Sequence, residues 1–246
     1  MDKMRYCIAN WKMNITVSAA MKFIDAWQNK DLSNKSVKTI ICPPFTALYP
    51  IASFIEKISF ELGAQNVYHE DVGAFTGEIS CEMLKELGCK WVIIGHSERR
   101  TTFGETNEMI RRKLHHVVSR GMSAILCIGE TMDERNNGQT TIVLEKQLKK
   151  AFANLESDNI SSIVIAYEPV WTIGTGSIAS SDVVAKAHAE IHEIMQEYGE
   201  HIAVIYGGSV TEENVSSLSK INNVNGFLVG GASLDIEKFY DIYNQL

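Results

Sequence analysis

The sequence predicts an α/β fold in which eight strands, each followed by a helix, close into a single (β/α)8 barrel. Eight short apolar runs recur along the 246 residues, and helix-like segments separate them. Most of the runs lack polar alternation, which is typical of parallel strands covered on both faces. Eight such units in a chain of about 250 residues match the size of a closed barrel. An open, doubly wound sheet is the alternative, and such a sheet usually binds its ligand at one switch point.

The expected strands are short runs rich in β-branched and other apolar residues. They are Tyr6–Ala9, Val37–Cys42, Phe60–Ala64, Trp91–Ile94, Met122–Cys127, Ile163–Ala166, Ala203–Tyr206 and Gly226–Val229.

The segments between the strands repeat apolar residues at helical spacing. Ser18 is a candidate cap of the first helix, and the helix over Ile110–Val118 ends before Gly121. The longest helix is expected over Val143–Leu155, and a later helix runs from a candidate Ser181 cap to a stop before Gly199. No segment has the composition of a linker, so residues 1–246 are expected to form one domain.

Composition and charge exclude several classes of protein. The net charge is −7, from 23 basic and 30 acidic residues, and no basic stripe indicates a nucleic-acid partner. No apolar run is long enough to cross a bilayer, and the charged start of the chain does not resemble a secretory signal. The five cysteines have no Cys-x-x-Cys spacing, so we expect free thiols, a cytoplasmic location and no zinc or disulfide framework.

Residues with possible chemistry follow six of the expected strands directly. They are Asn10 and Lys12, His96 and Glu98, Cys127, Glu168, Gly207-Gly208-Ser209, and Gly230-Gly231. In a parallel barrel the carboxyl ends of all strands ring one face, where active sites are built. The sequence therefore predicts one site at this face.

The stretch from Ala166 to Ala179 predicts a carboxylate under a mobile lid. Glu168 ends a strand, and Pro169 stops the ladder there because it lacks a backbone donor. Trp171 and two glycines follow, and this composition suits a loop that covers a ligand and excludes water. A carboxylate under such a lid would lose hydration, so we expect its pKa to rise toward the range of a general base. The alternative is a surface loop with a solvated glutamate.

The glycine pairs after the last two strands are candidates for a phosphate site. Glycines let backbone N–H groups approach an anion, and helices expected near Thr211 and near Ser233 or Asp235 would add partial positive charge. Lys12 would supply a cation if it reaches inward, and it is otherwise an ordinary exposed lysine.

Two features concern histidines. His96 precedes a possible helical turn at Ser97, whose positive end would disfavour an imidazolium; otherwise it is a satisfied buried histidine. His188 and His192 have the spacing of two metal ligands, but no third ligand accompanies them, so we expect helix-surface residues and no metal site.

The segment from Gln65 to Glu78 is long for a connection between a strand and a helix. Phe75 on such a loop would be costly in water unless covered. The loop either docks into another subunit or folds back on its own barrel.

Seven stretches resemble the triosephosphate isomerase family in their joint order and spacing. They are Asn10–Asn14, Gly73–Glu78, Gly95–Arg100, Cys127–Glu130, Ala166–Trp171, Tyr206–Val210 and Leu228–Leu234. The resemblance covers almost the whole chain and implies a closed TIM barrel in a homodimer, with Thr76 reaching toward the partner's site. It also implies interconversion of dihydroxyacetone phosphate and glyceraldehyde 3-phosphate through an enediolate, without a metal or organic cofactor.

Residue roles follow from the same resemblance, and this family is a worked example of acid–base tuning. Glu168 would be the base and His96 the neutral electrophile. Lys12 would stabilise the enediolate and the phosphate, with Glu98 supporting its charge and Asn10 orienting the substrate. Gly174, Ser209, Gly230 and Gly231 would donate to the phosphate, while Cys127 would support the site. Thr172, Ser177-Ile178, Ile15 and Asn225 depart from the family's frequent residues without touching a catalytic role.

Two other classes of protein remain as alternatives. A barrel aldolase would usually need a Schiff-base lysine or a metal set at the strand ends, and Lys12 is the only lysine so placed. A silent binding protein would lack the base or the electrophile, and both are present in this sequence.

Overall fold

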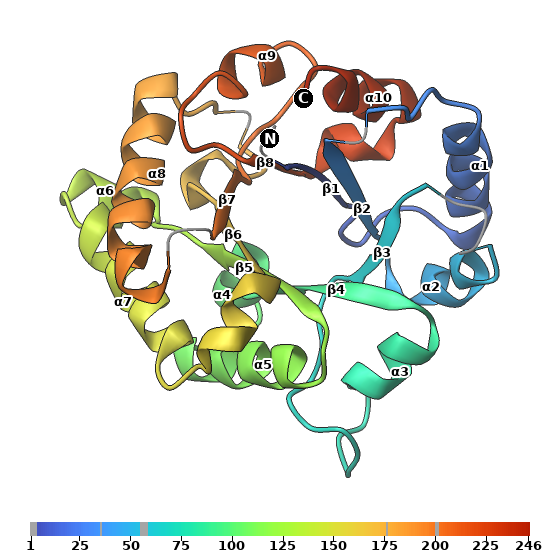
Figure 1. Ribbon diagram of the computed structural model, residues 1–246, viewed down its shortest axis with the longest axis horizontal. Helices are drawn as coiled ribbons and strands as arrows, with labels where there is room; N and C mark the ends of the chain where they lie inside the picture. The colour runs from blue at the N-terminus through green and yellow to red at the C-terminus, as the bar shows by residue number, and fades with distance from the viewer. Residues whose placement is uncertain (1–3, 35, 55–58, 176, 200–201) are drawn as a thin grey trace.

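Eight parallel strands form a closed barrel in the computed structural model, which describes residues 4–34, 36–54, 59–175, 177–199 and 202–246. The strands follow one another around the ring in chain order, and β8 pairs with β1. Figure 1 looks down the ring and shows the helices surrounding it. The predicted (β/α)8 barrel is confirmed, and the open sheet is wrong because the first and last strands are hydrogen-bonded.

Each predicted apolar run falls on one strand, with ends that differ by a few residues. The strands are β1 (Arg5–Asn10), β2 (Val37–Cys42), β3 (Glu61–Ala64), β4 (Cys89–Ile94), β5 (Ser123–Ile128), β6 (Ile163–Tyr167), β7 (Ala203–Tyr206) and β8 (Gly226–Val229).

The helices that cover the barrel are longest where the sequence shows clear helical spacing. The α-helices are α1 (Val17–Gln28), α2 (Phe45–Ala52), α3 (Cys81–Glu86), α4 (Ser97–Thr101), α5 (Asn107–Ser119), α6 (Met132–Asn136), α7 (Thr140–Phe152), α8 (Ser181–Met195), α9 (Val215–Leu218) and α10 (Ile236–Asn244). Short 3-10 turns are η2 (Ser157–Ser162), η3 (Val170–Thr172), η4 (Gln196–Tyr198) and η5 (Gly231–Leu234).

Three helix limits differ from the prediction. Thr16 rather than Ser18 caps α1, and Ser180 rather than Ser181 caps α8, because these residues have extended backbones and their side chains accept N–H groups three residues on. The longest α-helix among the described residues is α8, with 15 residues, whereas α7 has 13. Helix α7 ends before Leu155 because Asn154 adopts a positive φ of 61°.

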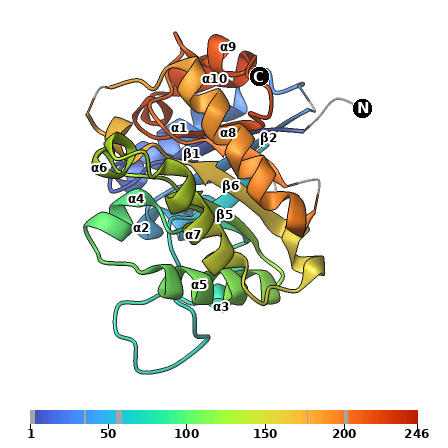
Figure 2. The same cartoon turned by 90° about the vertical axis from the view of Figure 1, so that its left-hand side faces the viewer.

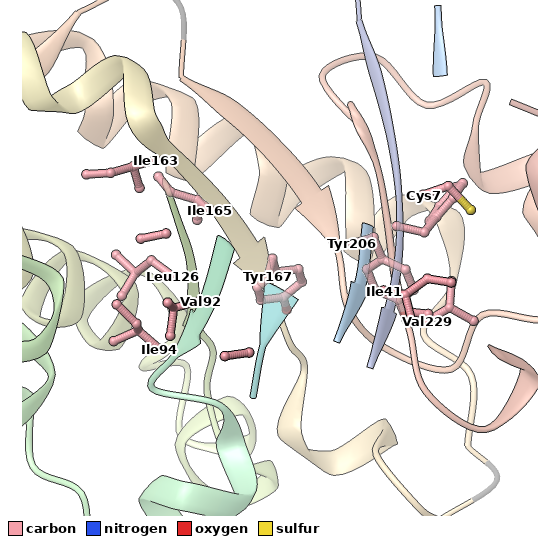
Figure 3. Close-up of a cluster of buried hydrophobic side chains, with 14 of the residues drawn as sticks. Cys7, Ile41, Val92, Ile94, Leu126, Ile163, Ile165, Tyr167, Tyr206 and Val229 are labelled. Atoms are coloured by element: carbon pink, nitrogen blue, oxygen red, sulfur yellow. The ribbon is translucent and has the colours of Figure 1, made fainter. Parts of the chain in front are cut away.

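The pleat of the strands divides the core into two layers. On β1, Ile8 points into the barrel, while Cys7 and Ala9 point toward the helices. Figure 3 shows part of the outer layer, including Val92 and Leu126 of neighbouring strands β4 and β5. Both faces of the strands are therefore apolar, as predicted, and polar chemistry is left to the strand ends.

The segment between β3 and α3 projects from the barrel as a long loop, visible in two perpendicular views (Figures 1 and 2). Its Phe75 ring packs against Tyr68 of the same loop, with 4.5 Å between ring centroids, and still remains 40% exposed. Thr76 at the tip is exposed. The loop thus does not bury Phe75 against its own barrel. Across the described part of the chain, no helix is long and apolar enough to cross a membrane.

Candidate active site

A pocket of about 520 Å³ lies at the carboxyl ends of the strands. It gathers residues from the ends of five strands and from the lid after β6. Those singled out from the strand ends and the lid that line it are Asn10, Lys12, His96, Glu168, Gly174, Gly207, Gly208, Ser209, Gly230 and Gly231. The pocket is partly apolar, with Ile173, Leu228 and Leu234 in its wall. The strand-end residues of a parallel barrel thus converge on one cavity, as the topology requires.

Glu168 follows β6 directly and is 1% exposed. Its N–H donates to Ile128 O at 2.7 Å, which continues the ladder one residue beyond the strand. The Ser97 N–H donates to Oε2 at 2.9 Å. Oε1 lies 3.0 Å from His96 Nε2 but has no well-aligned hydrogen-bond donor among the described residues. A buried carboxylate oxygen without an aligned donor is costly, and it faces the pocket, where a reacting proton would sit.

The pKa of Glu168 is lowered in this ligand-free site, contrary to the prediction from the sequence. Burial alone would raise this pKa, but the charge of His96, the contacts with His96 and Ser97, and Lys12 lower it. The sequence indicated the burial and did not reveal the donors around the carboxylate. Glu168 is therefore ionised, and a base must be ionised to accept a proton.

His96 caps the N-terminus of α4, and its Nδ1 accepts the N–H of Glu98 at 3.3 Å. An accepting Nδ1 places the ring proton on Nε2, which faces Glu168. Helix α4 is the helical turn that was predicted to begin at Ser97. The pKa of His96 is nevertheless raised: burial, the largest single effect, lowers it, but the charge and contact of Glu168 together with the charge of Glu98 outweigh burial. The expected bias against imidazolium is thus reversed while Glu168 stays in contact.

Lys12 has a left-handed backbone, with φ of 51°, that other residues hold in place. Asn10 Oδ1 accepts the Lys12 N–H at 3.0 Å, and Gln65 Nε2 donates to the Lys12 carbonyl at 2.8 Å. The ammonium lies 2.7 Å from Glu98 Oε1. A Cβ on Gly230 would lie 3.5 Å from Lys12 Cε, which is ordinary van der Waals contact, so the lysine side chain lies directly beside the glycine loop after β8. Gln65 was not predicted as a site residue, although it follows β3 directly and its strand-end position alone indicates it.

The helices after the two glycine loops do not supply the free N-terminal N–H groups that the predicted phosphate site requires. Helix α9 begins at Val215, four residues later than expected, because the Asn214 side chain accepts the Thr211 N–H at 2.9 Å. A helix of four residues adds little dipole. Asp235 caps α10 as expected, but its carboxylate accepts two of the helix N–H groups. Any anion in this pocket must therefore rely on loop N–H groups and side chains.

The lid is anchored at its first turn, η3. Glu130 is completely buried, and its carboxylate accepts Tyr167 Oη at 3.1 Å and Trp171 Nε1 at 3.3 Å, while Arg135 pairs with it at 3.2 Å. Thr172 is also buried, and its carbonyl accepts Ser209 Oγ at 2.9 Å. The lid therefore contacts the loop after β7 directly. No role was predicted for Glu130, because its contacts come from α6 and the lid and are not visible in the sequence.

The remaining residues singled out from the sequence lie outside the pocket wall or belong to no group of metal ligands. Cys127 is buried in the barrel interior, and burial together with the nearby Glu168 charge raises the pKa of its thiol. His188 is buried rather than on the helix surface, and its Nδ1 contacts Asn223 O at 3.1 Å. Within the described ranges no cluster of three potential metal ligands exists. Gly176, the second lid glycine, lies outside the described residues.

A closed parallel barrel that holds an ionised carboxylate, an imidazole and a lysine in one pocket defines a (β/α)8-barrel enzyme of the acid–base type. More narrowly, the chain belongs to the triosephosphate isomerase family, whose sequence model matches residues 5–246.

Relatives named triosephosphate isomerase cover nearly the same length. The protein from Lawsonia intracellularis is 46% identical over 239 residues, which is 95% of each chain. That from Endomicrobium trichonymphae is 45% identical over 94% of each chain, and that from Aquifex aeolicus is 42% identical over 97% of this chain and 98% of its own.

Proposed function

We propose that this protein interconverts dihydroxyacetone phosphate and D-glyceraldehyde 3-phosphate by proton transfer through an enediolate. The family membership supports the reaction, and one structural observation carries the mechanism. This observation is the convergence of Glu168, His96 and Lys12 on one pocket, with Glu168 Oε1 lacking an aligned donor. A proton next to a carbonyl is weakly acidic, so the reaction needs a base together with donors that stabilise the oxyanion.

Glu168 is proposed as the base and His96 as the electrophile. Because their side chains are only 3.0 Å apart, no substrate fits between them in this state. Substrate entry must move the carboxylate away from Ser97 and His96 toward the reacting carbon. The contacts with His96 and Ser97 lower the pKa of Glu168, so their loss raises that pKa and makes the carboxylate a stronger base as the substrate binds. The same movement removes the charge that raises the pKa of His96, which then acts as a neutral donor.

Lys12 is proposed to stabilise both the enediolate and the phosphate, with Asn10 and Glu98 positioning it. Asn10 fixes the lysine backbone and Glu98 binds its ammonium, so the cation is already oriented before substrate arrives. Preorganised charge stabilises the transition state without reorganisation at the moment of reaction. Cys127 lies beside Glu168 as a neutral thiol in the barrel interior and is proposed to support the base by packing.

Gly174, Ser209, Gly230 and Gly231 are proposed to bind the phosphate from three loops. Gly174 belongs to the lid and the others to the loops after β7 and β8, so phosphate binding can draw the lid down. Binding energy from this remote group then helps to offset the cost of closure. A closed lid keeps water from the enediolate, which would otherwise lose phosphate.

The direct test is isomerisation of glyceraldehyde 3-phosphate by the purified, chelator-treated protein, coupled to reduction of dihydroxyacetone phosphate. We expect full activity after chelation, because the proposed groups are all side chains and N–H groups of this chain. Glu168→Gln should lose about 10²- to 10⁴-fold in kcat, since it keeps the size of the side chain and removes the base. Activity that requires an added metal, or a Glu168→Gln variant with more than a tenth of the wild-type kcat, would contradict the proposal.

We further propose that the whole chain, residues 1–246, forms one domain that works as a cytoplasmic homodimer, with Thr76 and Phe75 contacting the partner. The projecting loop leaves Phe75 and Val72 of the same loop exposed, which is costly unless a surface covers them. Light scattering should give twice the chain mass of 27.4 kDa. Phe75→Asp should raise the monomer fraction, whereas Met132→Asp, at a similarly exposed residue of α6, should not. A monomeric wild-type protein would exclude this assembly.

A further inference from the structure

A lysine and a glutamate form an ion pair at the solvent side of the same pocket. Lys238 in the first turn of α10 places its Nζ 3.2 Å from Glu212 Oε1 in the loop after β7. Both residues line the pocket that contains Glu168. The Lys238 side chain is 52% exposed and that of Glu212 is 29% exposed, whereas Glu168 is 1% exposed. The pair is therefore far more accessible to water than the base, and this exposed part of the pocket is called its mouth.

The charge around this pair is unfavourable for an anionic ligand. The protein carries a net charge of −7, and three carboxylates, from Glu168, Glu212 and Asp235, line the pocket. Lys12 and Lys238 are the lysines among the described residues of its wall, and Lys12 is bound to Glu98 at 2.7 Å. Near the mouth, Lys238 is thus the cation that an arriving phosphate group would meet.

The two partners of the pair differ in freedom to move. Lys238 has a flexible four-carbon stem and half of its side chain in water. Glu212 is held at its backbone, since its carbonyl accepts Gln245 Nε2 at 3.0 Å. A dianionic phosphate therefore competes with Glu212 for the lysine, and the glutamate limits how much positive charge the mouth presents.

We propose that Lys238 is a specificity-determining residue that attracts the phosphate group of the substrate to the pocket, and that Glu212 restrains its charge. The identity of the ligand rests on the proposed isomerase function, whereas the position of the ion pair in the pocket does not. Lys238 does not contact Glu168 or His96, so its role concerns capture of the ligand and not proton transfer. Attraction of this kind depends on ionic strength and on the charge of the ligand.

The size of the effect follows from Coulomb's law. A unit charge about 10 Å from a dianion in water changes the encounter rate about fourfold without salt, and much less above about 0.5 M salt. Lys238→Gln should therefore lower kcat/KM roughly three- to fivefold at low ionic strength, because Glu212 is then unpaired at the mouth. Glu212→Gln should raise kcat/KM roughly two- to threefold, and the double variant should return close to wild type because the pair is neutral overall.

The experiment measures kcat and kcat/KM for glyceraldehyde 3-phosphate in these three variants at low ionic strength and at about 0.5 M salt. Lys149→Gln is the matched control, since Lys149 forms a comparable exposed pair with Glu145 at 2.6 Å and does not line the pocket. We expect unchanged kcat, opposite shifts in kcat/KM for the two single variants, and convergence at high salt. Unphosphorylated glyceraldehyde should show no such shifts.

Three results would overturn the role of Lys238. They are equal effects of Lys238→Gln and Lys149→Gln, shifts that persist at high salt, or a fall in kcat. Wild-type protein without isomerase activity would instead refute the proposed function. In that case, titration with inorganic phosphate decides the inference separately: Lys238→Gln must weaken binding at low salt while Lys149→Gln does not, and equal binding would refute it.

Discussion

Gly207 tests whether the position of Glu168 limits the reaction. A Cβ at Gly207 would lie 3.0 Å from Glu168 Cγ and 3.6 Å from Oε1. This Cβ–Cγ contact is tighter than ordinary carbon contacts, so in Gly207→Ala the Glu168 side chain must give by a few tenths of an ångström. A misplacement of about 1 Å costs on the order of 10²-fold in rate. A shift of a few tenths of an ångström should cost less, so we expect kcat to fall about three- to tenfold, or about 0.7 to 1.4 kcal/mol in barrier height.

Phosphate affinity should change little in the same variant. The Gly207 N–H donates to Tyr167 O at 2.8 Å, so it is not available to a phosphate group. The assay compares kcat with the inhibition constant of inorganic phosphate, and thermal unfolding reports any general damage. The double variant Gly207→Ala with Glu168→Asp should lose less than the product of the single losses, because the shorter side chain leaves room for the methyl group. An unchanged kcat, or equal losses of turnover and phosphate affinity, would refute this reasoning.

Three further perturbations test other parts of the molecule. Lys12→Met should abolish both turnover and phosphate inhibition because charge is lost beside the anion, and near-normal inhibition would show that Lys12 is peripheral. Thr172→Ala removes the hydrogen bond from Oγ1 to Pro169 O at 2.8 Å. Because the Thr172 N–H still donates to that carbonyl, urea unfolding should show a loss of only about 1 kcal/mol, and a loss above about 3 kcal/mol would contradict this. Burial lowers the pKa of His188 to about 4. Between about pH 6.5 and 4 the unfolded chain therefore binds a proton that the folded chain does not, so the free energy of unfolding decreases as the pH is lowered. The total loss in the free energy of unfolding is about 3 kcal/mol. His188→Asn should make the free energy of unfolding less dependent on pH between pH 7 and 4.5, and an unchanged pH dependence would contradict the assignment.

The sequence predicts the barrel well because its strands are apolar on both faces. The runs Ile163–Ala166 and Ala203–Tyr206 have no polar face, so only a sheet covered by helices and filled inside can bury them. Strand order then follows from the repeated alternation of strands and helices, and it brings Asn10, His96 and Glu168 to one end.

The electrostatics of the site could not be read from the sequence in the same way. Burial of Glu168 is implied by its strand end, but its pKa is set by His96 and by the Ser97 N–H, 71 residues away in the chain. Likewise, Gln65 fixes Lys12 across 53 residues, and the Asn214 side chain delays the start of α9. These effects depend on side-chain contacts between loops, which periodicity does not encode.

Deuterium exchange during turnover tests the central claim most directly. When dihydroxyacetone phosphate is converted in D₂O, proton transfer by Glu168 through an enediolate predicts deuterium at C2 of that fraction of the glyceraldehyde 3-phosphate whose abstracted proton exchanges with solvent before it returns, as measured by NMR. Glu168→Gln should introduce deuterium about 10²- to 10⁴-fold more slowly, while His188→Asn at pH 7 should match wild type. A Glu168→Gln variant that introduces deuterium as fast as wild type would contradict a carboxylate base in this pocket.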